Sequence, residues 1–292
     1  MISRRRFLGQ ASAAALYTAG HGALSYATPL GLPLGIQLYS VRQELAKDYE
    51  GTLLAVASAG YTEVEAAGFF NRSAADVKQA MEKAKLRCVS SHHPMGDLRQ
   101  NFDEILAFNK ELGVQYLICS SAAFKDPSAS HAGKNLAIED WSWNAEQFNQ
   151  MGEKAAKAGI KFGYHNHIHE FTPTDGKVPY MELLRITDPA KVTFELDCGW
   201  AIVAGIKPEE LMRDHPHRFS LFHVKDFKIV PGATGEPKVT ELGLGSIDYR
   251  PIFKQAAKNQ KIQHMFVEQE AFDMPWQESL KTDADYMKKL KV

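Results

Sequence analysis

The stretch "AKAGIKFGYHNH", residues 156–167, contains the pattern that decides the fold. A helix-like segment ends at Gly159, a short apolar run follows, and histidines begin where that run stops. Glycine commonly ends a helix in the left-handed conformation, and a short apolar run between such signals is typical of a buried strand. The same order of helix, glycine and strand occurs in "ASAGYTEVE", residues 57–65, and in "KELGVQYLI", residues 110–118. The repetition predicts parallel strands connected by helices.

Eight such runs are predicted as strands, and helix-like windows separate them. They are residues 34–39, 62–67, 87–91, 115–120, 161–166, 192–197, 219–224 and 264–269. Eight strands that alternate with helices predict a (β/α)8 TIM barrel, a single α/β domain over residues 28–292. A doubly wound open sheet is the alternative, but "YSVRQEL", residues 39–45, stands where that fold carries a glycine-rich dinucleotide fingerprint.

The first 27 residues are predicted to lie outside this domain. "SRRRFLG", residues 3–9, contains the pair Arg4 and Arg5, and a short run of small and apolar residues and "SYA" follow before Thr28. This segment resembles a twin-arginine export signal with cleavage after Ala27. It implies the twin-arginine export machinery as a partner and a periplasmic location. The apolar run is too short and too broken for a membrane span, so no stable membrane anchor is expected.

Charge and cysteine content exclude several classes of protein. The 292 residues carry a formal net charge of -1, with acidic and basic residues interleaved, so no nucleic acid partner is expected. The three cysteines show no C-x-x-C spacing, which argues against a disulfide framework and against a zinc knuckle. The composition, 45% hydrophobic and 24% charged, fits a globular domain with a sizeable core.

Two long connections follow predicted strands. Residues 121–144 contain Trp141 and Trp143, and residues 228–246 end in "GLGS", residues 243–246. Both are expected on the catalytic face of the barrel, as lids or binding loops or else as disordered insertions. "GLGS" is a candidate anion site at a helix start.

Polar residues end most of the predicted strands, and a TIM barrel carries its catalytic groups at those ends. In chain order they are Gln37, Tyr39, Glu63, Glu65, His92, His93, His165, His167, Asp197, His223, Glu268 and Glu270. Asp197, His223 and Glu268, with an imidazole of the fifth strand, offer a mixed oxygen and nitrogen shell for Mn, Co, Mg or Zn. His165, His167 or both are the candidates from that strand, since a one-residue change of strand phase would turn Tyr164 and Asn166 inward instead.

Five motifs give the chain a resemblance to a known family. They are "GYHNHIHEF" (163–171), "FELDCGW" (194–200), "LFHVKDF" (221–227), "LGLGSIDY" (242–249) and "FVEQE" (266–270). Their order and spacing are similar to those of the sugar phosphate isomerase/epimerase family, the xylose-isomerase-like TIM barrels that also include inosose dehydratases and endonuclease-four nucleases. The resemblance implies one divalent metal ion held by an acid of strand five, an acid of strand six, a histidine of strand seven and an acid of strand eight. The last three correspond to Asp197, His223 and Glu268.

The chain departs from this family pattern at two positions. His165 stands where many epimerases have glutamate, and Trp200 stands where they have the histidine of "D-x-x-H". A strict two-glutamate epimerase is therefore not expected. Glu170 is a candidate replacement for the missing carboxylate, although "HEF" is also compatible with the start of a surface loop.

The chemistry expected from this shell is proton abstraction next to a carbonyl through an enediolate. Glu268 is a candidate ligand and base, His165 or His167 completes the shell, and Lys225 is either a cationic electrophile or the ion-pair partner of Glu268 or Asp197. The candidate substrate-binding residues are Gln37, Tyr39, Glu65, His92, His93, Glu170 and Trp200.

The sequence predicts a sugar isomerase or epimerase that acts on a non-phosphorylated keto-sugar. A dehydratase or lyase for a keto-sugar or keto-glycoside is the alternative with the same metal site, and a non-enzymatic sugar-binding barrel is a second one. An endonuclease-like phosphodiesterase would need further ligands and a basic groove, which the balanced charge argues against. The sugar, the metal and the oligomeric state stay open, and a homo-oligomer is compatible with the sequence.

Overall fold

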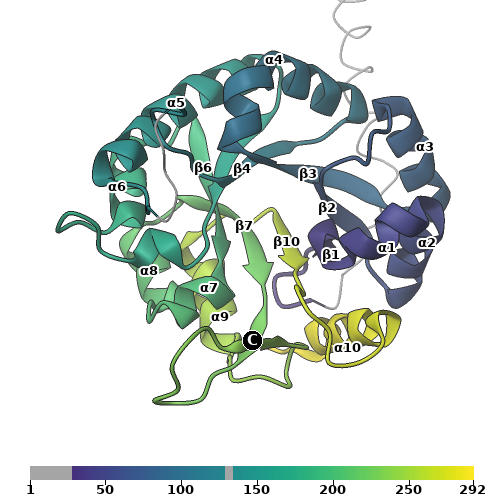
Figure 1. Ribbon diagram of the computed structural model, residues 1–292. Coiled ribbons are helices and arrows are strands. Elements are labelled where there is room, and N and C mark those ends of the chain that lie inside the picture. Colours follow the sequence, from purple (N-terminus) through teal and green to yellow (C-terminus); the bar gives the residue numbers. More distant parts are fainter. Residues whose placement is uncertain (1–27, 129–133) are drawn as a thin grey trace, which may run out of the picture.

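The computed structural model describes residues 28–128 and 134–292, and these form a closed barrel of eight parallel strands (Figure 1). Neighbouring strands follow the order β1-β10-β7-β6-β5-β4-β3-β2, and β10 pairs with β1 to close the barrel. The strands are β1 (Gly35–Gln37), β2 (Glu63–Ala67), β3 (Arg87–Pro94), β4 (Tyr116–Ser121), β5 (Lys161–His165), β6 (Val192–Asp197), β7 (Phe219–Val224) and β10 (His264–Val267). Each overlaps one predicted run, which confirms the TIM barrel. The predicted export signal, residues 1–27, lies outside the described residues.

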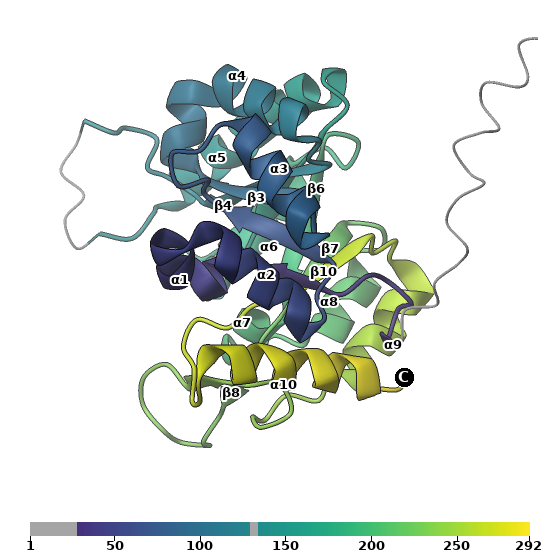
Figure 2. The same ribbon diagram turned by 90° about the vertical axis from the view of Figure 1, so that its right-hand side faces the viewer.

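Helices surround the strands, and α10 packs against α2 so that the last helix lies beside the first long one (Figure 2). They are α1 (Arg42–Lys47), α2 (Tyr49–Ala59), α3 (Ala74–Ala84), α4 (Met95–Leu112), α5 (Ile138–Lys157), α6 (Pro179–Ile186), α7 (Cys198–Val203), α8 (Pro208–Asp214), α9 (Arg250–Asn259) and α10 (Trp276–Lys289), with two 3-10 helices, η1 (Leu38–Val41) and η2 (His169–Phe171). None of the helices described has the length and apolarity that a membrane crossing requires.

Three helices end just before the glycines that the sequence singled out, α2 and α4 directly and α5 with Ala158 in between. Gly60, Gly113 and Gly159 have φ values of 107°, 88° and 82°, in the left-handed region. A side chain is strained in that region, so glycine ends each helix and lets the chain turn directly into the next strand.

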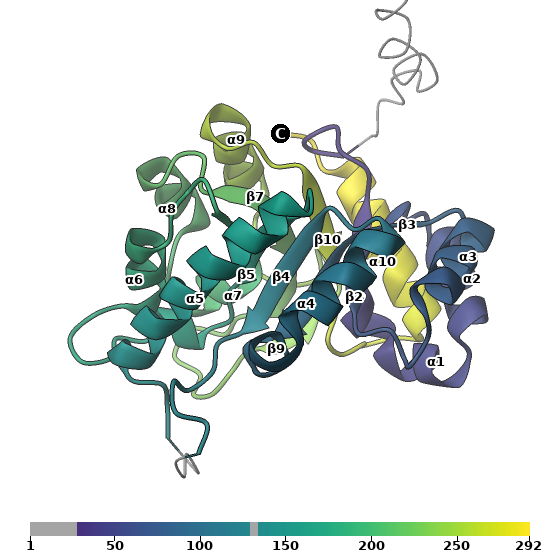
Figure 3. The same cartoon turned by 90° about the horizontal axis from the view of Figure 1, so that it is seen from above.

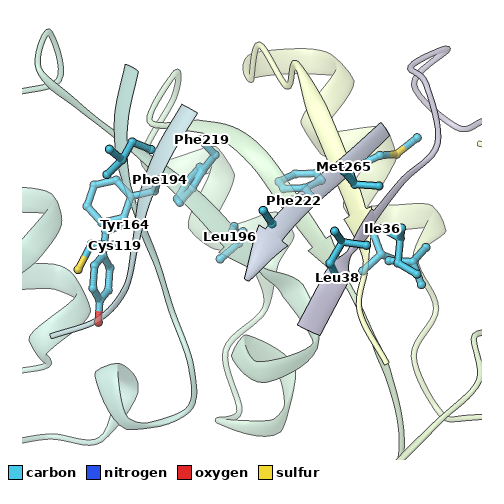
Figure 4. Close-up of a cluster of buried hydrophobic side chains, with 14 of the residues drawn as sticks. Ile36, Leu38, Cys119, Tyr164, Phe194, Leu196, Phe219, Phe222 and Met265 are labelled. Atoms are coloured by element: carbon cyan, nitrogen blue, oxygen red, sulfur yellow. The ribbon is translucent and has the colours of Figure 1, made fainter. Parts of the chain in front are cut away.

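Side chains alternate between two layers of core along the strands. One layer packs between the strands and the helices, and Figure 4 shows part of it, including Ile36, Tyr164, Phe194 and Phe222. The other is a small apolar cluster that comprises Val89, Tyr116, Ile118, Leu221 and Phe266. Because His223 follows Leu221 by two residues and Glu268 follows Phe266 by two residues, both polar side chains share the face of this inner cluster, nearer the carboxyl ends of the strands.

The first long connection is shorter than predicted. Helix α5, which packs against β5 (Figure 3), begins at Ile138, so Trp141 and Trp143 belong to a helix and not to a loop. The Asp140 carboxylate explains this start, because it accepts a hydrogen bond from the Ala137 amide at 3.0 Å.

The second connection contains an antiparallel pair of strands, β8 (Asp226–Lys228) and β9 (Lys238–Thr240). The Asp226 carboxylate accepts hydrogen bonds from the backbone amides of Gly243, Gly245 and Ser246 at 3.0–3.2 Å. The "GLGS" segment therefore does bind an anion, but that anion is a carboxylate of the same chain. The expectation that "GLGS" binds a free anion is therefore wrong, because Asp226 occupies these amides.

Candidate metal centre

Four strands bring four potential ligands together inside the carboxyl end of the barrel. His165 ends β5, Asp197 ends β6, His223 lies in β7 and Glu268 directly follows β10. In the strand register Asp197 is paired with His223. All four residues are buried, and one ligand atom from each lies within 4.8 Å of the others. The sequence predicted this set.

Asp197 occupies its position because it both ends a strand and begins a helix. Its Oδ1 accepts the Trp200 amide at 2.7 Å, which caps α7. Its Oδ2 is buried and has no hydrogen-bond partner in the structure. Burial raises the pKa of Asp197, although Lys225 and His223 act in the opposite direction. This Oδ2 oxygen lies 3.5 Å from the Lys225 ammonium, and a buried carboxylate oxygen that makes no hydrogen bond is available as a metal ligand.

The strand phase predicted for the fifth strand is right. Tyr164 faces away from the site and donates to Glu170 at 2.6 Å, and Asn166 bonds the backbone of Asp197. His165 is buried inside the barrel, and its Nδ1 makes no hydrogen bond but lies 3.2 Å from Glu195 Oε2. Burial, with the neighbouring His223, holds the pKa of His165 well below its usual value, so the imidazole is in the neutral form that binds metals. His167 is not one of the four clustered ligands, and the geometry favours His165.

A second layer of ionisable residues lies deeper in the barrel. His92 Nε2 is 2.6 Å from Glu195 Oε2 and 2.8 Å from Glu65 Oε1. Burial opposes a charge on His92, but the two carboxylates raise its pKa to about 9. Burial and the charge of Glu65 raise the pKa of Glu195 to about 7. Together with His165 and His223, His92 and Glu195 form a second group of possible metal ligands.

Glu195 was missed by the sequence reasoning, which searched only the ends of strands. A usable signal existed, because Glu195 precedes Asp197 by two residues and therefore shares its face of the strand.

Lys225 is fully buried among carboxylates. Its ammonium lies 2.5 Å from Glu270 Oε1, 2.8 Å from Glu268 Oε2 and 3.5 Å from Asp197 Oδ2. It also lies 4.9 Å from the ring centre of Trp200. Although burial raises the pKa of Glu268, Lys225 and His223 outweigh it and hold that pKa well below its usual value. Of the two roles left open for Lys225, the structure shows the ion pairs.

A pocket of about 540 Å³ opens above this cluster. Seven of the predicted site residues form part of its wall: Tyr39, His92, His93, His165, His167, Trp200 and Glu268. Tyr39 is 43% exposed, and the Arg42 guanidinium stacks 3.9 Å from its ring centre. Burial lowers the pKa of His93 to about 4, so this wall residue is uncharged.

Three of the predicted substrate-binding residues do not form part of the wall. Gln37 and Glu65 are buried beneath the pocket, where the Gln37 amide donates to Glu65 at 2.7 Å. Glu170 is buried and accepts hydrogen bonds from the Tyr164 hydroxyl and the His167 amide, one on each carboxylate oxygen. For these three residues a contact with substrate stays a prediction.

Comparison with known proteins adds a family and several relatives. The model of the family described as xylose isomerase-like TIM barrel matches residues 53–290. An inosose dehydratase from Clostridium botulinum is 25% identical over 235 residues, which cover 72% of this chain and 78% of that protein. A solved structure of a sugar phosphate isomerase/epimerase from Parabacteroides distasonis has a TM-score of 0.71 and 28% identity, and covers 93% of this chain and 97% of that one. The IolI protein, solved with a bound zinc atom, shares the fold at 13% identity with a TM-score of 0.68 over 87% of this chain and 96% of that one.

Proposed function

Because the chain belongs to the xylose isomerase-like TIM barrel family, we propose that it is a divalent-metal-dependent dehydratase for a keto-sugar or a related cyclic ketone. The observation that carries this proposal is the buried set of His165, Asp197, His223 and Glu268 beneath the pocket. Two of these residues keep a buried atom without a hydrogen-bond partner, His165 Nδ1 and Asp197 Oδ2.

This donor set fits a divalent ion. Two carboxylates and two imidazoles suit Mn, Co or Zn, and the pocket side leaves room for substrate oxygens. Such an ion, when bound, supplies positive charge to the carbonyl oxygen of the substrate and so acidifies the adjacent carbon. His165, Asp197, His223 and Glu268 would hold it.

The residues in the pocket wall supply the proton transfers. Glu268 accepts the proton from the carbon next to the carbonyl, and the electron pair of that C–H bond forms the enolate. When the carbonyl re-forms, a double bond forms between the deprotonated carbon and the next carbon of the substrate. The C–O bond of the hydroxyl on that next carbon breaks, and the departing hydroxyl takes a proton to leave as water. His92 and His167 line the same pocket and are placed to give this proton.

We favour dehydration over epimerisation because of the residue that ends β5. An epimerase of the two-glutamate type needs a second carboxylate opposite the first, but β5 ends in His165. Both oxygens of Glu170, the candidate replacement, are engaged by Tyr164 and His167. The similarity to an inosose dehydratase also favours dehydration over epimerisation. Isomerisation or epimerisation is the second candidate, because the same enolate can be reprotonated and because the structure at 28% identity is named as such an enzyme.

The pocket favours a substrate without phosphate. None of the described residues in its wall is arginine or lysine. Lys225, just below, is engaged by three carboxylates. Tyr39 and Trp200 offer aromatic surface in the wall, which suits the apolar face of a sugar ring.

Export through the twin-arginine route is part of the proposal and rests on the pair Arg4 and Arg5. Amino-terminal sequencing of the protein from a periplasmic extract tests it. A mature chain that begins at Thr28 is expected, and an intact amino terminus in the cytoplasmic fraction would contradict it.

The reaction is tested with a panel of keto-sugars and inososes in D2O, followed by NMR and mass spectrometry. We expect exchange of the proton next to the carbonyl and loss of one water. Both should require Mn, Co or Zn and disappear with a chelator. An isomeric product without loss of water would favour the second candidate. Metal-loaded protein that binds a sugar but exchanges no proton would show a binding protein instead.

A further inference from the structure

Both ring nitrogens of His223 face carboxylates. Nδ1 lies 3.2 Å from Glu268 Oε2 and 3.9 Å from Asp197 Oδ2. Nε2 lies 2.7 Å from Glu65 Oε1 and 3.3 Å from Glu195 Oε2. A metal ion takes the lone pair of one ring nitrogen, and the other nitrogen then carries the proton. The surroundings of the two nitrogens therefore decide which one serves as the ligand.

Each side of the His223 ring faces a group of possible ligands, and the Nδ1 side is the more favourable one for an ion. Asp197 and Glu268 lie there, and they belong with His165 to the candidate ligand group. Asp197 Oδ2 makes no hydrogen bond and lies 3.5 Å from the Lys225 ammonium, so an ion at this place would gain a buried carboxylate oxygen as a ligand. The ion would replace the hydrogen bond between His223 Nδ1 and Glu268 Oε2.

The Nε2 side is occupied by a carboxylate that its neighbours hold in place. Glu65 accepts hydrogen bonds from the Gln37 amide at 2.7 Å and from the Ser90 hydroxyl at 2.5 Å. The imidazole of His92 lies 2.8 Å from the same carboxylate. With these partners Glu65 has little freedom to move toward an ion, and its oxygen lies where it accepts the Nε2 proton of His223.

We propose that Glu65 is a positioning residue that holds the proton on Nε2 of His223 and so presents the Nδ1 lone pair to the divalent ion. Gln37 and Ser90 fix the Glu65 carboxylate in turn. This inference rests on the proposed metal-dependent function and gives roles to three buried residues that do not line the pocket, Glu65, Gln37 and Ser90. A carboxylate behind a metal-bound imidazole typically strengthens ion binding by about 10–100-fold.

The chain offers a matched control in the same strand. Glu63 precedes Glu65 by two residues in β2, is equally buried, and also contacts an imidazole, with Oε2 at 2.7 Å from His264 Nδ1. His264 is the first residue of β10, and Glu268, the candidate ligand, directly follows that strand, so Glu63 is remote from the metal centre. Glu63→Gln and Glu65→Gln therefore remove the same charge from two similar pairs.

The experiment compares the dissociation constants of Zn²⁺ and Co²⁺ for the wild type, Glu65→Gln and Glu63→Gln, measured by competition with a chromophoric chelator. The melting temperature of each metal-free protein and the visible spectrum of each Co²⁺ form are recorded beside them. We expect Glu65→Gln to bind the ions at least about 10-fold more weakly and to show a changed Co²⁺ spectrum. Glu63→Gln should bind both ions as the wild type does, even if its melting temperature falls further.

Unchanged affinity in Glu65→Gln, beside a wild type that binds one ion, would overturn this inference alone. Equal weakening in both variants would overturn it too, because the effect would then follow general stability. A wild type that takes up neither ion would overturn the proposed function and this inference with it.

Discussion

Strand β2 places one glutamate toward each end of the barrel interior, Glu63 at its first residue and Glu65 two residues later. At the amino end, Glu63 contacts His264 and forms an ion pair with Arg87, and His264 Nε2 faces Gln115 at 3.4 Å. Every polar atom of the Glu63 and His264 side chains has a partner. Around Glu65, by contrast, buried polar atoms lack hydrogen-bond partners.

The difference concerns three buried atoms that make no hydrogen bond: His165 Nδ1, Asp197 Oδ2 and Glu195 Oε1. Two of them have an ion-pair contact instead, His165 Nδ1 at 3.2 Å from Glu195 Oε2 and Asp197 Oδ2 at 3.5 Å from Lys225 Nζ. A buried polar atom that makes no hydrogen bond typically destabilises a fold by about 1–3 kcal/mol when no other group compensates for the loss. The comparison indicates that the cluster around Glu63 and the cluster around Glu65 have different roles. The amino-end cluster, with satisfied hydrogen bonds, stabilises the barrel, whereas the carboxyl-end cluster, with unsatisfied atoms, is the one that we propose binds an ion.

The largest expected effect is the loss of ion binding and turnover when a ligand at the carboxyl end is removed. His223→Ala and Glu268→Ala should each retain far less than one ion per chain after desalting, with turnover reduced by more than the roughly 10–100-fold typical of a residue behind a ligand. Elemental analysis and the D2O exchange assay measure both. Either variant with full ion content and normal exchange would break the comparison.

The next effect is a loss of stability without a loss of function at the amino end. Glu63→Ala leaves His264 and Arg87 without their carboxylate, and breaking a buried pair typically destabilises by about 3–5 kcal/mol, less here because the side chain of Arg87 is 61% exposed. Urea unfolding of the metal-free protein measures the change. Turnover per folded molecule should stay at the wild-type level, and a large drop in turnover would show that the two ends are coupled.

Asp283 in α10 is a third buried carboxylate to set beside Glu63 and Glu65. Its Oδ2 makes no hydrogen bond, but it is not among the candidate metal ligands. Its Oδ1 accepts the Leu242 amide at 2.6 Å, and burial raises its pKa from 3.8 to about 8. The folded protein thus holds a proton that the unfolded chain releases above about pH 4. The stability that this proton gives is present at low pH and is lost as the pH rises through 8.

The slope expected from this single proton is at most about 1.4 kcal/mol per pH unit. Thermal or urea unfolding of wild type and Asp283→Asn between pH 5 and 9 measures it, since the asparagine keeps the hydrogen bond to Leu242 without titrating. Parallel stability curves for the two proteins would contradict the assignment.

The smallest expected effect concerns the metal-free stability of Asp197→Asn. The asparagine oxygen still caps α7, and Lys225 keeps Glu268 and Glu270 as partners. Unfolding of the metal-free variant should therefore differ from wild type by less than about 1 kcal/mol, although its ion affinity falls. A strong destabilisation would mean that Asp197 serves the fold in the same way as Glu63.

The sequence was sufficient for the fold because local signals agreed along the chain. Glycine at three helix ends and apolar runs between helices predicted the eight strands, and barrel closure then brought Asp197, His223 and Glu268 together. Those residues stand where strands end, and a barrel has only one carboxyl face.

Other features depend on tertiary contacts that periodicity does not contain. Glu63 was grouped with the strand-end residues, yet it lies at the opposite end because β2 begins with it. Glu195 lies inside a strand, one layer below Asp197, and was overlooked. The amides of "GLGS" could not be assigned to Asp226 from sequence, since 17 residues separate Asp226 from Gly243.

Anomalous diffraction at the zinc or cobalt edge, from crystals of the metal-loaded protein, tests the central claim most directly. The account predicts one peak per chain within bonding distance of His223 Nδ1, with His165, Asp197 and Glu268 as its other neighbours. A protein that shows no peak there, or a peak on the Nε2 side of His223 between Glu65 and Glu195, would contradict it.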